Sequence, residues 1–332
     1  MKKTLFHILY RLRVYPAFPS APLGSAVILT YHGFTDKNTR NGIENHQGKH
    51  VLIEKFEKQI QFLKKNYHLL SLQEWVRSCR ESKKMPKRSV ILTLDDGYRS
   101  NYTLAFPVLK KYDVPATVFV STAFVEERVP LWPDRLEYAL NKGPARSGNP
   151  FEFETGFRLQ LKQMPPGQRL RAVEEIENQS GRRLDFREET PAIYQPLQWS
   201  EVLEMLKSGL VTIGSHTHTH PILTRCSPED MKTELQFSKN IIEKQTGEPC
   251  RLFCYPNGGP GDFNAATKSL LQATGYECGL TTAEGFNTPR TDFYELKRMG
   301  VRNQTDDAEF AMTVCGFKHA MSEIRGFFGR TL

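Results

Sequence analysis

The sequence predicts an α/β protein built as a (β/α) barrel, and three observations lead to this prediction. First, short apolar segments rich in β-branched residues alternate with amphipathic helical segments along most of the 332 residues, which is the pattern of a parallel sheet. Second, roughly six to eight such units recur, and that number favours a barrel over an open sheet. Third, polar residues follow several of the apolar segments, where barrels of this kind carry their active sites.

The strands and helices are placed in chain order from hydrophobic periodicity. The predicted strands are residues 26–30, 67–70, 90–94, 116–120, 211–213, 251–255, 276–280 and 295–301. One helix is predicted from the apolar face of Ile53, Phe56, Ile60 and Leu63, and further helices are predicted at residues 102–111, 201–208, 228–246 and 265–274. Ser200 and Ser227 are the predicted N-caps of two of these helices, and Gly209 and Gly247 are predicted to end them.

Residues from about 125 to 198 break the alternation of strands and helices, and they contain several prolines and a charged helix near residues 168–179. Because this segment leaves directly from the end of a predicted strand, we interpret it as an insertion over the active-site face. The predicted organisation is a basic amphipathic segment at residues 1–24, a barrel domain at residues 25–302 that contains the insertion, and a helical C-terminal segment at residues 303–332.

The composition is that of an ordinary globular protein, with 39% hydrophobic and 25% charged residues and a net charge of +8. The positive charge suits an anionic partner such as a membrane surface, a lipid pyrophosphate or an acidic glycan. We expect no nucleic-acid partner, because the basic residues are spread along the chain and form no known recognition motif. The six cysteines form no metal-binding spacing, so we expect them to be reduced and mostly buried.

The first thirteen residues are basic and amphipathic. Their apolar positions are Leu5, Phe6, Ile8, Leu9 and Leu12. The stretch is too short and too interrupted by charge for a typical signal peptide, and no run approaches the roughly 20 apolar residues that span a bilayer. We therefore expect a cytoplasmic protein rather than a secreted one. The segment either rests reversibly on the inner face of the membrane or docks as a helix against the barrel.

Two segments carry the residues typical of a metal-assisted hydrolase. Asp95 and Asp96 end one apolar run, and His216, His218 and His220 follow another. One carboxylate and two imidazoles can hold a divalent ion, while the second carboxylate takes a proton from water. Each segment alone also suits a solvated turn or a solvated histidine tract. The spacing does not choose among the three histidines.

At these residues the chain resembles the polysaccharide deacetylase family, the NodB-homology carbohydrate esterases. Residues 93–98 match the family motif T-F-D-D-G-[YF], and residues 216–220 match H-[ST]-x-x-H. Residues 253–258 stand where the family carries R-P-P-Y-G or F-A-Y-P-Y-G. Residues 31–34 resemble the opening Y-H-x-[IFL] of a branch that acts on exopolysaccharides and cell-surface glycans. The resemblance covers about residues 26–301 and implies a distorted seven-stranded barrel in a deacetylase-like catalytic domain.

The resemblance also implies a role for individual residues. Asp95 would be the general base, and Asp96, His216 and His220 would bind the metal. A backbone donor at Asn257 would stabilise the oxyanion. Zinc is the favoured metal, and cobalt, nickel, manganese and iron also suit these oxygen and nitrogen ligands. The predicted substrate-binding residues are Tyr98, Trp132 and Tyr255.

Two departures from the family pattern affect the mechanism. Cys254 stands where many relatives carry an arginine that orients the base, although one branch carries alanine there. No L-x-x-H motif follows Leu280, so the family's usual general acid is missing. His32, at the end of the first predicted strand, is the candidate for that role. The alternative is that His32 is a structural histidine at the mouth of the barrel.

The resulting prediction is a metal-dependent hydrolase that removes N-acetyl groups from N-acetylhexosamine residues of a glycan or glycan precursor. One alternative keeps the fold and metal but makes the protein a deformylase or amidase acting on a lipid-linked sugar. Another is a glycan-binding member of the same fold that has lost catalysis. The presence of Asp95, Asp96, His216 and His220 together argues against that last alternative, because a binding protein does not need all four.

Overall fold

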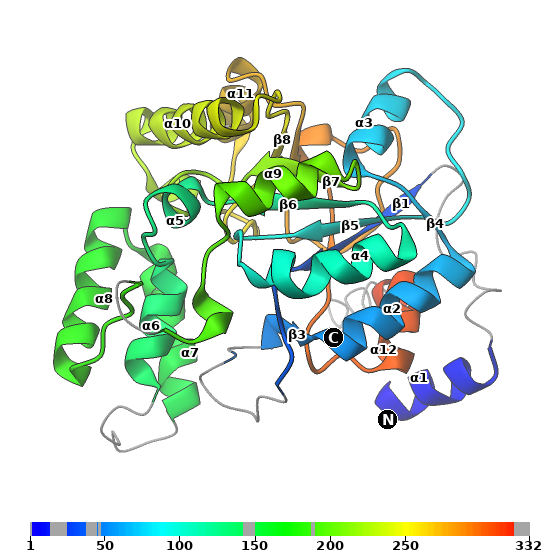
Figure 1. Ribbon diagram of the computed structural model, residues 1–332, viewed down its shortest axis with the longest axis horizontal. Helices are drawn as coiled ribbons and strands as arrows, with labels where there is room; N and C mark the ends of the chain where they lie inside the picture. Colours follow the sequence, from blue (N-terminus) through cyan, green and yellow to red (C-terminus); the bar gives the residue numbers. More distant parts are fainter. Residues whose placement is uncertain are drawn as a thin grey trace, which may run out of the picture.

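Parallel strands at the centre of the molecule form a curved sheet surrounded by helices (Figure 1). The computed structural model describes residues 2–13, 25–37, 45, 48–141, 150–186 and 190–321. The parts of the predicted terminal segments and insertion at residues 14–24, 142–149, 187–189 and 322–332 lie outside these ranges. The strands on the main path of the sheet are β1 (Ala26–Tyr31), β5 (Ser89–Leu94), β6 (Ala116–Val120), β7 (Val211–Ser215), β8 (Leu252–Cys254), β9 (Cys278–Leu280) and β10 (Met299–Gly300).

The sheet closes into a barrel through the chain that leads into β10. Its strand order is β10-β1-β5-β6-β7-β8-β9, and β4 (His68–Leu69) pairs with β5 off this path. Leu296 donates to the Gly279 carbonyl at 3.0 Å and accepts from the Thr281 N–H at 2.8 Å, while β10 itself pairs with β1. The predicted seven-stranded (β/α) barrel is confirmed. The last strand is shorter than predicted because residues 293–295 form a 3-10 turn.

Helices between the strands cover the outside of the barrel. They are α2 (Ile53–Asn66), α4 (Phe106–Tyr112), α9 (Trp199–Lys207), α10 (Pro228–Thr246) and α11 (Ala265–Ala273). Ser227 caps α10 as predicted, since its hydroxyl accepts from the Asp230 N–H at 3.1 Å. The predicted cap at Ser200 is wrong. Gln198 caps α9 through a capping box with Glu201, and Ser200 lies inside the helix.

Alternation along the strands directs the active-site residues into the barrel. Val27 and Leu29 pack outward in the main apolar core, whereas Ala26 and Ile28 belong to a separate apolar cluster. Helix α3 (Leu72–Arg80), which the periodicity did not reveal, adds Trp75 to that second cluster and so covers the end of the barrel where the strands begin. Successive strand residues face opposite sides of a sheet. The side chain of Asp95 therefore also points into the barrel, but at the end where the strands finish.

The insertion forms a helical unit with its own small core. It contains α6 (Trp132–Leu140), α7 (Pro150–Gln163) and α8 (Pro166–Ser180), preceded by α5 (Thr122–Glu126). Leu136, Leu161 and Val173 form the centre of its apolar cluster. Arg135 on α6 binds Glu177 on α8 through two hydrogen bonds, of 2.9 and 2.6 Å, away from solvent. The three helices therefore form a packed unit beside the barrel (Figure 1).

Two short additions complete the fold. β2 (Gly33–Thr35) and β3 (His50–Leu52) form a two-stranded parallel sheet just after β1. A single turn of π-helix, Asn101–Ala105, precedes α4, and its Asn101 amide donates to the His32 carbonyl at 2.6 Å. All six cysteines are free, and five are buried while Cys226 is partly exposed. The prediction that they are mostly buried is confirmed.

The N-terminal helix α1 (Lys2–Arg11) packs against α12 (Asp307–Val314) near the C-terminal end of the barrel domain. Phe6 is only 2% exposed in a cluster with Ala311, Met312 and Cys315. Leu5, Ile8 and Leu12 are instead 37%, 50% and 66% exposed. The predicted apolar stripe is thus divided between a docked face and an exposed face. Among the described residues, no helix is long and apolar enough to cross a membrane.

Candidate active site

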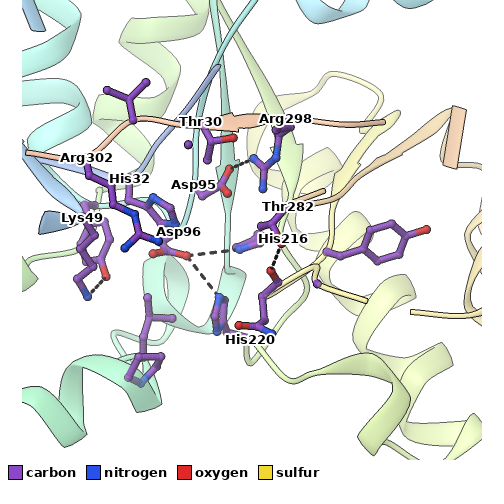
Figure 2. A pocket seen from close by; sticks show the side chains of 18 of the residues that line it. Thr30, His32, Lys49, Asp95, Asp96, His216, His220, Thr282, Arg298 and Arg302 are labelled. Atoms are coloured by element: carbon purple, nitrogen blue, oxygen red, sulfur yellow. Dashed lines mark hydrogen bonds and ion pairs between the residues drawn. The ribbon is translucent and has the colours of Figure 1, made fainter. Parts of the chain in front are cut away.

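A cavity of about 750 Å³ opens at the ends of the strands, and residues from six strand ends and from the insertion line it. The residues at its centre follow β1, β5, β7, β8 and β9. They are His32, Asp96, His216 and Thr282, which Figure 2 labels, and Asn257. Trp132 and Arg158 extend the wall from α6 and α7. The sheet topology therefore gathers residues that are distant in sequence into one polar site, as expected for a parallel barrel.

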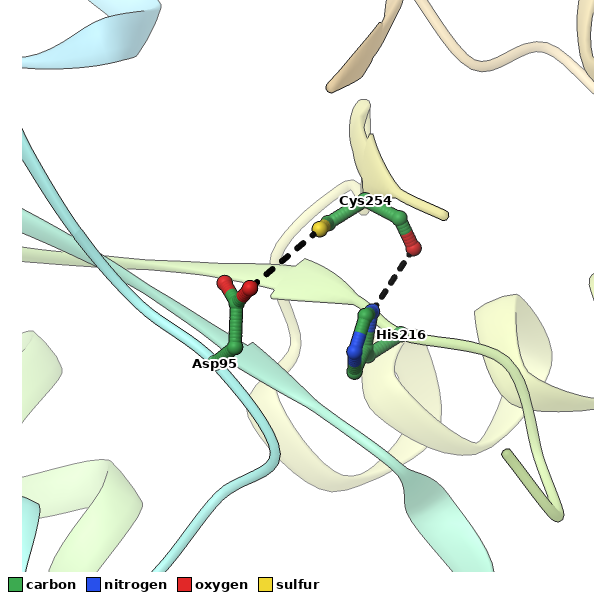
Figure 3. Close-up of side chains that lie close together, drawn as sticks. All are labelled: Asp95, His216 and Cys254. Atoms are coloured by element: carbon green, nitrogen blue, oxygen red, sulfur yellow. Dashed lines mark hydrogen bonds between the residues drawn. The ribbon is translucent and has the colours of Figure 1, made fainter. Parts of the chain in front are cut away.

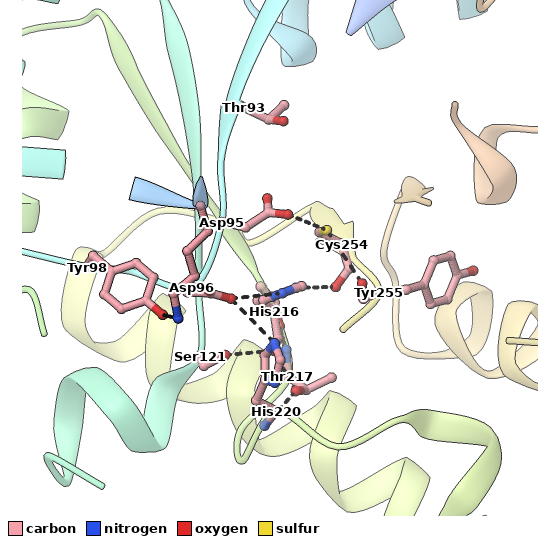
Figure 4. Close-up of polar contacts among 12 residues, drawn as sticks. Thr93, Asp95, Asp96, Tyr98, Ser121, His216, Thr217, His220, Cys254 and Tyr255 are labelled. Carbon is pink, nitrogen blue, oxygen red and sulfur yellow. Dashed lines mark hydrogen bonds and ion pairs between the residues drawn. The ribbon is translucent and has the colours of Figure 1, made fainter. Parts of the chain in front are cut away.

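Asp96, His216 and His220 form a compact group of three ligands (Figure 4). The Nε2 atoms of both imidazoles lie 3.4 Å from Asp96 Oδ1. One ligand atom from each residue lies within 4.8 Å of the other two, and all three side chains are nearly buried. Two neutral imidazoles and a carboxylate with room for further ligands are typical of a catalytic divalent cation. The residues fit such a cation.

The orientation of His216 is fixed by the neighbouring strand. His216 Nδ1 lies 2.8 Å from the carbonyl oxygen of Cys254. Because only a protonated Nδ1 can donate to that carbonyl, Nε2 is the ring nitrogen left to face Asp96 and to bind a metal. Ser121 adds a second restraint by donating its hydroxyl to the His216 carbonyl at 3.1 Å. This imidazole is thus held in a metal-binding orientation by its surroundings.

The backbone around the ligands adopts conformations that side chains rarely tolerate. Asp96, Thr217, His220 and Asn257 have positive φ angles of 77°, 67°, 60° and 63°. Non-glycine residues seldom occupy this region, and such strain is concentrated at functional sites. The His220 N–H donates to the Thr217 hydroxyl at 3.1 Å, so the turn after β7 is stabilised locally. The strained turns bring Asp96 and His220 back toward each other.

Asp95 is held by an arginine that sequence reasoning did not identify. Arg298 Nη1 donates to Asp95 Oδ1 at 2.8 Å, and Arg298 Nε donates to the Thr281 carbonyl at 2.8 Å. Both side chains are almost fully buried. Burial would by itself raise the pKa of Asp95, but the charge of Arg298 and the nearby His216 outweigh it, so the pKa is lowered. The carboxylate therefore remains ionised and correctly oriented to accept a proton.

Arg298 orients Asp95, the role that the family resemblance assigns to an arginine at the position of Cys254. It lies just before β10, 203 residues after Asp95. No spacing rule connects the two positions, and only the closure of the barrel between β9 and β1 brings them together. The one arginine inside the last predicted strand, residues 295–301, was the available signal in the sequence.

A second group of possible ligands, Asp95, His216 and Cys254, is less suited to a cation (Figure 3). Burial raises the pKa of the Cys254 thiol, and its Sγ donates to Asp95 Oδ2 at 3.6 Å. A protonated thiol is not a metal ligand. His216 has also already used Nδ1 on the Cys254 carbonyl. Cys254 instead helps to orient both Asp95 and His216.

His218 is turned away from the ligand group. Its Nδ1 lies 2.8 Å from the Thr122 hydroxyl, and its Nε2 lies 3.2 Å from a carboxylate oxygen of Glu127. Its ring packs edge-on against Phe237. The structure therefore separates the three histidines that spacing could not distinguish, placing His216 and His220 beside Asp96 and His218 against α5.

His32 lines the same cavity beside Asp96, and Figure 2 shows both close to Arg302. Burial lowers the pKa of His32, while the charges of Asp96 and Asp95 oppose that effect. Its position at the end of β1 is determined by the strand and by the hydrogen bond from Asn101 to its carbonyl. The His32 imidazole therefore faces the same cavity as Asp95, Asp96, His216 and His220.

Asn257 lines the cavity in the turn after β8. Its side-chain amide donates to Asp262, and its carbonyl accepts from the Thr282 hydroxyl at 3.0 Å. Within the described ranges, its backbone N–H has no hydrogen-bond acceptor. The Tyr255 N–H, in contrast, donates to the Leu280 carbonyl at 3.0 Å. The peptide at Asn257 can therefore donate to a ligand in the cavity.

The three predicted substrate-binding residues differ in what they can offer. Tyr255 donates its hydroxyl to the Tyr294 carbonyl at 2.9 Å, and Tyr98 donates to Asp134 at 2.8 Å. Both hydroxyls are therefore engaged with the protein. The indole N–H of Trp132 has no hydrogen-bond partner among the described residues, although Trp132 is only 6% exposed and lines the cavity. Trp132 is thus the one of the three whose polar group is not engaged by the described protein, although its indole nitrogen is itself buried.

The insertion is attached to the barrel mouth by a buried polar cluster that the sequence did not reveal. Lys49 donates to Asp134 at the start of α6 and to the Tyr98 hydroxyl at 3.1 Å. Burial would lower the pKa of Lys49, but Asp134 and Glu137 outweigh it, so the pKa is raised. Asp134 is fully buried, and the cluster fixes Trp132 two residues earlier against the cavity.

Known proteins share both the motifs and the fold. The polysaccharide deacetylase family model matches residues 82–279. The chain belongs to the polysaccharide deacetylase family. It is 39% identical over 295 residues to the poly-β-1,6-N-acetyl-D-glucosamine N-deacetylase of Staphylococcus epidermidis, covering 84% of this chain and 80% of that protein. It is 36% identical over 322 residues to the Staphylococcus aureus protein of the same name, covering 91% and 84%.

Solved structures of deacetylases have the same fold. A Streptococcus pyogenes deacetylase in complex with acetate aligns with a TM-score of 0.61 at 22% identity, covering 88% of this chain and 99% of that chain. The IcaB protein of Ammonifex degensii aligns with a TM-score of 0.57 at 18% identity, covering 88% and 97%. The protein is thus a polysaccharide deacetylase, a hydrolase of carbon–nitrogen bonds, with the NodB-type barrel that the sequence predicted.

Proposed function

We propose that this deacetylase removes acetyl groups from N-acetylglucosamine residues of a glycan, with a divalent metal held by Asp96, His216 and His220. The observation that carries the proposal is the convergence of those three ligands beside a separate buried carboxylate, Asp95. The substrate class follows from the two staphylococcal relatives, which are named as poly-β-1,6-N-acetyl-D-glucosamine N-deacetylases. Zinc is the favoured metal on ligand chemistry.

A metal bound by these ligands supplies Lewis-acid polarisation and lowers the pKa of water. The protein supplies the base and its orientation. Asp95 accepts the proton of the attacking water, while Arg298 keeps its carboxylate ionised and directed into the cavity. Its second oxygen is held by the Cys254 thiol at 3.6 Å. The backbone N–H of Asn257 donates to the developing oxyanion.

His32 is the proposed proton donor to the leaving amine. It lines the cavity on the Asp96 side, and no other imidazole outside the ligand group lines the same cavity in the described part of the chain. General acids of this kind typically accelerate hydrolysis roughly a hundredfold or more. A His32→Gln variant that keeps its metal but loses acetate release supports the assignment. A variant with wild-type turnover makes His32 a structural residue.

The decisive test is acetate release from short β-1,6-linked N-acetylglucosamine oligomers, measured together with the metal content of the same sample. We expect turnover that is lost on chelation and restored by adding back zinc or another divalent cation. Turnover that persists after complete metal removal would overturn the metal-dependent mechanism. Metal binding without acetate release from any N-acetylglucosamine oligomer would overturn the proposed substrate class.

We also propose that the enzyme is cytoplasmic and associates reversibly with the inner membrane face through α1. The exposed side chains of Leu5, Ile8 and Leu12 lie on one side of the helix, and basic residues are exposed beside them. These are Lys3, Arg11 and Arg13. Charge complementarity with anionic lipid and the exposed apolar stripe together support weak binding, since each basic residue near such a surface contributes about 1 kcal/mol. Phe6 keeps the helix docked on α12.

Flotation with anionic vesicles at low and high salt tests the membrane proposal. We expect salt-sensitive flotation that is lost in a Leu5→Ser, Ile8→Ser double variant. Val129→Ser is a matched control, because Val129 is also an exposed apolar residue, at 45%, but lies outside α1. Absence of flotation, or equal loss in the control, would contradict the membrane proposal and leave α1 as a docking helix.

A further inference from the structure

Two of the three metal ligands, His216 and His220, lie at the ends of one short segment after β7, the ligand turn of residues 216–220. The direction of each imidazole toward Asp96 therefore depends on the backbone of this turn (Figure 4). Thr217 and His220 have positive φ angles of 67° and 60°, which non-glycine residues rarely adopt unless surrounding contacts enforce them. The ligand turn thus needs contacts from outside itself to keep its shape.

Glu234, on helix α10, binds the middle of the ligand turn. One oxygen of its carboxylate accepts from the backbone N–H groups of His218 and Thr219, at 2.8 and 2.9 Å. The other oxygen accepts from the Thr219 hydroxyl. Hydrogen bonds to a carboxylate are stronger than those between neutral groups. A single side chain thus holds two consecutive peptide groups that lie between the two imidazole ligands.

A second residue of α10 holds the start of the ligand turn. Ser238 lies four residues after Glu234, so both side chains project from one face of the helix. The Ser238 hydroxyl lies 2.8 Å from the Ser215 hydroxyl, which accepts from the Thr217 N–H at 3.2 Å. Three successive N–H groups of the ligand turn are therefore linked to α10, directly or through Ser215.

Helix α10 is anchored independently of the turn that it holds. Leu235, beside Glu234, and Ile242 are buried in the main apolar core. The Tyr276 hydroxyl donates to the Leu235 carbonyl at 3.0 Å, and Ser227 caps the start of the helix. Glu234 is thus presented to the ligand turn from a fixed element.

Glu234 itself lies outside the metal-ligand group. In the described part of the chain, it belongs to neither set of possible ligands. It reaches His216 and His220 only through the backbone between them. Residues that orient metal ligands typically change metal affinity roughly tenfold to a hundredfold when they are removed.

We propose that Glu234 is a positioning residue for the metal, and that its carboxylate fixes the ligand turn so that His216 and His220 face Asp96 before a metal binds. The inference rests on the proposed metal-dependent function and adds a residue to its site. A ligand set that is already ordered binds a cation more tightly, because the turn does not have to be ordered on binding. Glu234 thus acts on metal affinity through the backbone.

The zinc affinity of the full-length protein, measured by competition with a chromophoric chelator, tests this role. Glu234→Ala should weaken zinc binding roughly tenfold to a hundredfold. Glu234→Gln should keep most of the wild-type affinity, because its amide oxygen can accept from both N–H groups and its amide nitrogen can donate to the Thr219 hydroxyl. An equal loss in Glu234→Gln would assign the effect to the charge alone and overturn the positioning role.

Glu243→Ala is a matched control on the same helix. The Glu243 carboxylate also accepts from a backbone N–H, that of Cys250, at 3.0 Å, and it pairs with Lys239 at 3.1 Å. These contacts lie ahead of β8 and do not involve the ligand turn. Both alanine variants lose a contact between α10 and a loop, but only Glu234→Ala should lose zinc affinity.

Bound cobalt(II) gives a second readout, because its visible absorption depends on the geometry of its ligands. We expect altered absorption bands in Glu234→Ala and wild-type bands in Glu234→Gln and Glu243→Ala. A merely structural role of Glu234 would lower the thermal stability of the metal-free protein and leave both the cobalt spectrum and the zinc affinity unchanged.

The outcomes separate failure of this inference from failure of the proposed function. Unchanged zinc affinity in Glu234→Ala would overturn the role of Glu234 and leave the metal-dependent function intact. An equal loss of affinity in Glu243→Ala would show that zinc binding follows overall stability and would also overturn that role. Absence of zinc and cobalt binding by the wild-type protein would overturn the proposed metal site together with the inference.

Discussion

The two walls of the active-site cavity are built on different physical principles. The barrel wall carries the reacting groups on strand ends, where positive φ angles at Asp96 and His220 hold the turns in place. The insertion wall carries Trp132 and Arg158 on helices that are held by a separate small core and by the Lys49–Asp134 contact. The first wall depends on backbone geometry and the second on side-chain packing. The proposed reacting groups thus lie on the barrel, and the insertion can vary without disturbing them because it has a core of its own.

The largest effect is expected at the base on the barrel wall. Asp95→Asn should lower kcat by roughly two to four orders of magnitude, because the proton acceptor is lost. Metal content should stay near normal, because Asp96, His216 and His220 remain. Acetate release and metal analysis on the same preparation check both points. Wild-type turnover in this variant would remove Asp95 from the mechanism.

Substitutions of the three histidines should differ clearly in how much bound metal they remove. His216→Ala or His220→Ala should lose bound metal and more than roughly a hundredfold of activity, an effect larger than that of disturbing an outer hydrogen bond. His218→Ala should retain most of its metal, since His218 contacts Thr122 and Glu127 instead. Metal analysis after dialysis measures the difference. Equal metal loss in all three variants would show that the ligand assignment is wrong.

Substitution of Arg298 tests whether this arginine orients Asp95, the proposed base on the barrel wall. Arg298→Gln should lower kcat about tenfold to a hundredfold, the contribution of a hydrogen bond to a charged group. Because Arg298 lowers the pKa of Asp95, its loss should raise that pKa. The acid limb of the pH–rate profile should then move to higher pH. The variant should also be less stable, since Asp95 is left buried without its partner.

Arg298→Lys serves as the control for this variant, because it restores the charge but not the forked geometry. It should recover most of the stability and part of the activity. A pH profile of Arg298→Gln that matches wild type would limit Arg298 to a structural role.

The smallest effect is expected on the insertion wall. Trp132→Phe should raise KM for oligomers about threefold to tenfold while leaving kcat nearly unchanged, since the smaller ring offers an oligomer in the cavity less contact surface. The ring is kept, so the packing beneath Arg158 and Arg169 should remain. A change confined to kcat would place Trp132 with the reacting groups and remove the functional distinction between the two walls.

Many residues of the barrel wall could be predicted, because short stretches of neighbouring residues specify both the strand and the polar groups at its end. A β-branched run that ends in Asp95 and Asp96 specifies both a buried strand and the place where its carboxylates emerge, and the family motifs select His216 and His220. The alternation of strands and helices predicted the parallel barrel. Helix α3 was missed although its buried residues Leu72, Trp75, Val76 and Cys79 have ordinary helical spacing after the N-cap Ser71, so this omission was not forced by the sequence.

Tertiary structure alone decided the contacts that join distant segments. Arg298 reaches Asp95 only because the chain before β10 closes the barrel, a pairing across 203 residues that leaves no periodic signal. The same holds for Lys49 with Asp134 and for the convergence of Arg302 with α7. The sequence by itself determined the strands, their reactive ends and the family, because those depend on neighbouring residues. Which charges meet across the cavity depends on the register and closure of the whole sheet.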